Sequence, residues 1–115
     1  MAIVNQNITT GATVDVLTVP AGKSYAITSV LITNTGPEDA TGAEDSRFYL
    51  YAVTGAYSST ASMIVNNALL PGAETFTLDT EKLVLGAGDY FKVSCSGTNS
   101  ISVVVSYLEA VSYTH

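Results

Sequence analysis

Few side chains in this 115-residue chain could do covalent chemistry, and they stand far apart in the sequence. The single imidazole belongs to His115, the last residue, and the single thiol to Cys95. A Ser/His/Asp or Cys/His mechanism needs an imidazole held beside the nucleophile, and chain ends seldom hold one. Cys95 occupies an inward position of an alternating segment without a basic neighbour, which predicts a small buried thiol. We therefore expect no catalytic residue and no enzymatic activity.

Carboxylates cluster in one stretch, where Glu38, Asp39, Glu44 and Asp45 precede Arg47. A Ca²⁺ site would need several of their oxygens to converge on one point, and the stretch lacks the alternating Asp/Asn spacing of a calcium loop. One Cys and one His are too few for a structural zinc site. The stretch is therefore interpreted as a solvated acidic loop, and we expect neither a metal nor a cofactor.

The composition excludes further classes of function. Four basic residues against ten acidic ones give a net charge of −6, which disfavours binding to nucleic acid. No apolar run is long enough to span a membrane, and the first residues lack the basic and apolar parts of a signal peptide. Charged residues make up only 12% of the chain, whereas 15 Thr and 12 Ser supply hydroxyls. Since β-branched residues favour strands, the composition predicts an all-β protein with a hydroxyl-rich surface.

Short alternating segments between turn residues predict an antiparallel β-sandwich, jelly-roll-like, of about eight strands. We expect one domain, with an N-terminal arm or edge strand at 1–12, the sandwich at 13–108 and a C-terminal tail at 109–115. The longest loop is expected at 36–46. The expected strands are 3–10, 13–19, 24–33, 47–53, 62–69, 74–78, 83–85, 90–95 and 101–108.

Two of these segments look apolar on both faces. In 24–33, period-two alternation puts Tyr25 and Ile27 on one face and Val30 and Ile32 on the other. In 47–53, the face opposite Phe48 carries Tyr49 and Tyr51. A loop could cover the second face. Alternatively this face meets another subunit, since tyrosine is enriched at protein interfaces.

The polar first segment could be an arm that lies on a neighbouring subunit. The candidate interface residues of the chain are Ile3, Val4, Val30, Ile32, Tyr49 and Tyr51.

Three features resemble a known group of proteins: the turn Pro20-Ala21-Gly22-Lys23, the long strand that ends at Asn34-Thr35, and the segment Leu83-Val84-Leu85-Gly86-Ala87-Gly88-Asp89. Together they are similar to small β-sandwich virion proteins of tailed bacteriophages, over about residues 13–108. The resemblance implies a structural role in the virion after synthesis in the host cytoplasm, and it brings no catalytic residues.

Within that group we favour a capsid decoration (cement) protein, because the chain has no coiled-coil or collagen-like stalk. Its expected partners are the major capsid protein and other copies of itself, for example in a trimer, with no nucleic acid and no membrane. The alternative is a tail or fibre module that recognises host-surface glycan through Tyr49, Tyr51 and Tyr57. The absence of Trp disfavours this alternative.

Overall fold

The computed structural model describes residues 2–54 and 60–111. It describes the side chains of all these residues except 60, 61, 80–82 and 111. The described residues form strands, turns and loops, and no helix among them could cross a membrane. The strands are β1 (Ala2–Ile8), β2 (Thr13–Thr18), β3 (Lys23–Asn34), β4 (Ser46–Thr54), β5 (Thr60–Leu70), β6 (Thr75–Leu85), β7 (Tyr90–Gly97) and β8 (Ile101–Val111).

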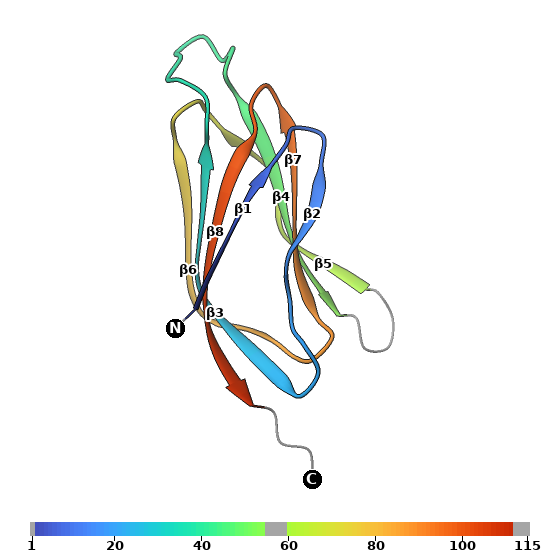
Figure 1. Cartoon of the computed structure of the whole chain (residues 1–115). Coiled ribbons are helices and arrows are strands. Elements are labelled where there is room, and N and C mark those ends of the chain that lie inside the picture. The colour runs from blue at the N-terminus through green and yellow to red at the C-terminus, as the bar shows by residue number, and fades with distance from the viewer. Residues whose placement is uncertain (1, 55–59, 112–115) are drawn as a thin grey trace.

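The eight strands form two antiparallel sheets that pack face to face (Figure 1). The first sheet has the order β1-β8-β3-β6, and the second has the order β2-β7-β4-β5. Except for β4 and β5, each strand is followed by a strand of the other sheet, which is the connectivity of a jelly roll. The predicted fold class is therefore confirmed. The segments expected at 74–78 and 83–85 belong to the single strand β6.

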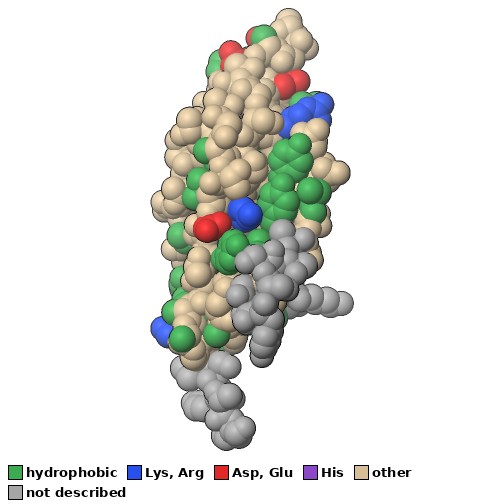
Figure 2. Space-filling view, turned by 90° about the vertical axis from the view of Figure 1, so that its right-hand side faces the viewer, with side chains coloured by type: hydrophobic (Ala, Val, Ile, Leu, Met, Phe, Trp, Pro, Cys, Tyr) green, Lys and Arg blue, Asp and Glu red, His purple; other side chains and the backbone are tan. Residues whose placement is uncertain are grey.

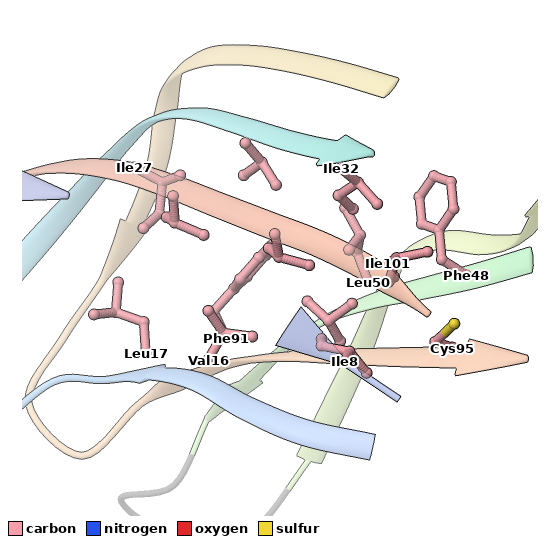
Figure 3. Packing of buried hydrophobic residues seen from close by; sticks show 14 of the residues in the cluster. Ile8, Val16, Leu17, Ile27, Ile32, Phe48, Leu50, Phe91, Cys95 and Ile101 are labelled. Carbon is pink, nitrogen blue, oxygen red and sulfur yellow. The ribbon is translucent and has the colours of Figure 1, made fainter. Parts of the chain in front are cut away.

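The core lies between the sheets and is built by period-two alternation. Phe48 and Leu50 of β4, Phe91 of β7, and Ile101 and Val103 of β8 are all fully buried, as the alternation predicted. Figure 3 shows Phe48, Leu50, Phe91 and Ile101 meeting from both sheets. Most residues of the opposite parity on these strands are half-buried or exposed; Val53 of β4 is an exception, with the parity of Tyr49 and Tyr51 but 2% exposed.

β3 departs from the predicted alternation at Thr28. Both neighbouring strands shift register between Ile27 and Ser29, so Thr28 has no partner on either side. Such a bulge reverses the phase of the strand. Tyr25 and Ile27 point inward before it, and Val30 and Ile32 point inward after it, all buried. The expectation of two apolar faces was wrong, because a single inward face changes parity halfway along the strand.

The first and last strands that the structure describes both belong to the sandwich. β1 pairs with β8 from Ala2 to Ile8, and Ile8 is fully buried, so this segment is an edge strand of the first sheet. β8 continues through the expected start of the tail and pairs Val111 with Lys23. Lys23 also forms an ion pair with Glu109 across this pair of strands.

A buried polar cluster joins the sheets at the opposite end. The side-chain amide of Asn34, on β3, donates to the carbonyl oxygens of Leu70 (2.9 Å) and Glu44 (2.7 Å). Its Oδ1 accepts from the backbone N–H of Gly36. Ser46 Oγ donates to the backbone carbonyl of Asn99. The backbone N–H of Asn99 in turn donates to Ser46 Oγ. These bonds satisfy the polar groups that burial would otherwise leave unpaired.

Candidate docking surface

The outer face of the second sheet carries the tyrosines that the sequence singled out. Phe48 and Leu50 of β4 point into the core, so Tyr49 and Tyr51 between them point away from it and are half-buried. Their rings stack with centroids 6.2 Å apart and planes 12° apart. The two rings therefore form one aromatic pair along the strand.

A cation covers one end of this pair. Lys92 of β7 stands opposite Tyr51 in the register, and its Nζ lies 5.5 Å from the centre of the Tyr51 ring. This distance is within the range of a cation–π interaction. Asp15 of β2 stands opposite Lys92 in turn, so opposite charges are neighbours across the strands.

Apolar side chains of the edge strand β5 extend the surface. Met63 lies opposite Tyr51 and Leu69 opposite Arg47, and they are 49% and 48% exposed. The Arg47 guanidinium donates to the carbonyl of Asn67 (3.0 Å), which fixes the arginine at the margin. We name this surface the tyrosine platform; it consists of Arg47, Tyr49, Tyr51, Met63, Leu69 and Lys92. Figure 2 shows hydrophobic side chains gathered on this side of the molecule between two basic groups.

The outer face of the first sheet differs from the platform. Hydroxyls form its contacts, as between Thr33 Oγ1 and Thr75 Oγ1 (2.9 Å). Apolar side chains are also exposed on this face: Ile3, Leu31, Val84 and Leu108. Leu108 and Val84 flank Ala26 across three strands, and Leu31 lies opposite Val104. Among the described side chains of these four strands, Asp79 is the charged residue that points outward.

The six predicted interface residues do not form one surface. Tyr49 and Tyr51 lie on the platform, whereas Ile3 and Val4 lie on β1 in the other sheet. Ile3 is exposed and Val4 packs partly against the core.

Val30 and Ile32 were wrongly placed on an outward face. Both are fully buried between the sheets, because the bulge at Thr28 turns them inward. They therefore cannot contact a partner. Tyr57 and His115 lie outside the described residues.

The platform also contains three residues that were not predicted from the sequence: Lys92, Met63 and Leu69. Alternation with Phe91 and Val93 does place Lys92 on an outward face. Its position beside Tyr51 depends on the pairing of β7 with β4, and strand order cannot be read from alternation. Register shifts between β4 and β5 interrupt the alternation of β5 between Met63 and Leu69. Alternation alone therefore does not place both side chains on the same face.

The predicted acidic loop borders an open hollow of about 530 Å³, together with the turn between β5 and β6. Its carboxylates are Glu38, Asp39, Asp45 and Glu74. Asp39 accepts hydrogen bonds from the hydroxyl and the amide of Thr41, and these lower the pKa of its carboxyl. Among the described residues no group of three or more Asp, Glu, His or Cys side chains is arranged to hold a metal ion.

The thiol of Cys95 lies in the core, as predicted. Burial raises its pKa above the ordinary value, which keeps it protonated at neutral pH and unsuited to nucleophilic attack. Its sulfur lies 3.5 Å from the carbonyl oxygen of Asn99, next to the buried polar cluster.

Compared with known proteins, the chain matches no family model and none of the curated proteins.

Proposed function

We propose that this protein is a non-enzymatic structural component of a bacteriophage particle that decorates the outer capsid shell and stabilises it. The observation that carries the proposal is the tyrosine platform, which combines two half-buried tyrosine rings with the exposed side chains of Met63 and Leu69 on one outer face. The jelly roll adds support, because viral capsid and lectin domains use this architecture. The sequence motifs that resemble small virion proteins of tailed bacteriophages point the same way.

The chemistry of the platform suits protein–protein docking. Tyrosine rings bury large areas on contact and keep a hydroxyl for hydrogen bonding, and Arg and Met are also enriched at interfaces. The stacking of Tyr49 on Tyr51 holds both rings in place before contact. Less conformational entropy is then lost on binding. A shell with many identical sites would be stabilised by mass action as copies bind.

The first test measures binding to purified expanded shells that lack the protein. Added protein should bind and raise the melting temperature of the shells. The double variant Tyr49→Ser/Tyr51→Ser should remain folded by circular dichroism and bind at least 10-fold more weakly. The control Leu31→Ser, on the outer face of the first sheet, should bind like the natural protein. Failure of the natural protein to bind would overturn the proposal.

The number of copies per particle separates the shell from the tail. Quantitative mass spectrometry of whole particles should find on the order of hundreds of copies, since decoration repeats at every equivalent site of a shell. A handful of copies would place the protein in the tail and contradict the cement function.

Glycan recognition in a tail or fibre is the second candidate. The tyrosine pair beside Lys92 favours it, because aromatic side chains with a few polar groups are typical of the lining of ligand sites. On a glycan array the natural protein would then bind defined glycans, and Tyr51→Ala would abolish that binding. An array without binding would remove this candidate.

A further inference from the structure

The sandwich has four edge strands, β1 and β6 in the first sheet and β2 and β5 in the second. An edge strand presents unpaired backbone N–H and C=O groups to which another strand can add. Proteins usually block such edges with charges, prolines or bulges. The four edges of this chain differ in this respect.

Three of the edges are blocked. β2 carries Asp15 and a register shift directly after it. β5 carries two register shifts and the left-handed residue Asn67, with φ 51°. β6 carries Asp79, Glu81 and Lys82 in its sequence and a register shift within the same stretch. A second strand could not run along any of these edges without meeting a charge or a break in the hydrogen-bond ladder.

The fourth edge, β1, has none of these devices. Its sequence from Ala2 to Ile8 contains no charged residue and no proline, and its seven consecutive pairs with β8 show no register shift. Solvent reaches the strand on both faces. Ile3 is 63% exposed on the outer face, and Gln6 is exposed although it shares the inward parity of Ile8. The edge is therefore regular, uncharged and accessible.

We infer that β1 pairs with β1 of a second copy of this chain, antiparallel, so that two first sheets join into one continuous eight-stranded sheet. An antiparallel pair of identical strands is related by a two-fold axis, which is the commonest symmetry of homo-oligomers. Every antiparallel register of Ala2–Ile8 on itself brings only uncharged side chains together. This matters because copies with a net charge of −6 repel one another elsewhere.

The inference goes beyond the proposed docking of the platform, which lies on the other sheet, and its test needs only the purified full chain. Sedimentation analysis at about 100 µM protein, where a micromolar dimer would be populated, should give a mass twice that of the 12.0 kDa chain. A monomer at this concentration, or a trimer, would overturn the inference, because neither contains an isologous pair of β1 strands.

Matched substitutions locate the contact. Asn5→Lys adds a charge to the middle of β1 and should weaken the dimer at least 10-fold, since it brings like charges together across the axis. Asn66→Lys makes the same change on the edge strand β5 and should leave the dimer unchanged. Thermal unfolding checks that both variants fold. A dimer that survives Asn5→Lys, or is lost with Asn66→Lys, contradicts the inference.

Hydrogen exchange provides a readout that requires no substitution. Amides of residues 2–8 should become protected as the concentration rises through the dimer range, while amides of β2 should not change. The Tyr49→Ser/Tyr51→Ser variant should keep this protection. Loss of the dimer in that variant would mean that copies meet through the platform, and the inference would fail while the platform remained an interface.

Discussion

The two outer faces of the sandwich share one core and have opposite characters. The second sheet presents stacked tyrosines between Lys92 and Arg47. The first presents threonine and serine hydroxyls together with exposed aliphatic side chains such as Ile3, Val84 and Leu108. Desolvating a hydroxyl surface costs less than desolvating charge, so both faces can be covered, but aromatic anchors are found on the second. We learn from this difference that a low content of charge does not by itself indicate where a partner binds.

The largest expected effect on stability comes from truncating a core side chain that lies between the two outer faces. Phe48 is fully buried directly behind Tyr49, and its ring lies 5.0 Å from that of Phe76 in the other sheet. Phe48→Ala should lower the free energy of unfolding by about 3–5 kcal/mol, measured by urea denaturation. Hydrogen exchange should show both sheets losing protection together. Loss in the second sheet alone would mean that the faces do not share one core.

A smaller effect is expected where hydrogen bonds join the sheets. Asn34→Ala leaves the carbonyl of Leu70 and the amide of Gly36 without their side-chain partner, whereas the carbonyl of Glu44 keeps the bond from Asn99 Nδ2. Unpaired buried groups should lower the free energy of unfolding by about 2–3 kcal/mol. Asn66→Ala, at an exposed position of β5, is the control and should change it little. Equal effects of the two substitutions would contradict the role of the cluster.

The interaction between Lys92 and Tyr51 gives a direct measure of how the platform is organised. A double-mutant cycle with Lys92→Met and Tyr51→Leu should yield a coupling of about 0.5 kcal/mol in the free energy of unfolding, as exposed cation–π pairs do. Raising the salt concentration should reduce it. A coupling of zero would mean that Lys92 does not order the ring.

The smallest expected effect concerns the ion pair at the end of the first sheet. Glu109 hydrogen-bonds Lys23 and raises the pKa of its ammonium above the ordinary 10.5. The stabilisation is therefore present below the pKa of the unfolded state and is lost as the pH rises through the higher folded pKa. The difference in melting temperature between the natural protein and Lys23→Gln should shrink between about pH 8 and pH 12. A difference that grows with pH would contradict this assignment.

Alternation predicted the parts of the fold that depend on one strand at a time. The inward Phe91 and Val93, the outward Val104 and the buried Cys95 follow from local parity. The platform depends on which strands are neighbours, and the sequence carries no local signal for placing Lys92 beside Tyr51. Val30 and Ile32 were misplaced for a related reason. Thr28 is unpaired because of how β3 meets its neighbours, and alternation within one strand does not reveal such a bulge.

That unpaired residue makes the length of β3 as important as its composition. Thr28 separates the half of β3 that contains Ile27 from the half that contains Ile32. Deleting it would keep every core side chain in the sequence. It would nevertheless direct either the half with Ile27 or the half with Ile32 toward water. A one-residue deletion here should therefore harm folding more than most substitutions, whereas the exposed loop residues 40–43 should tolerate changes of length more readily.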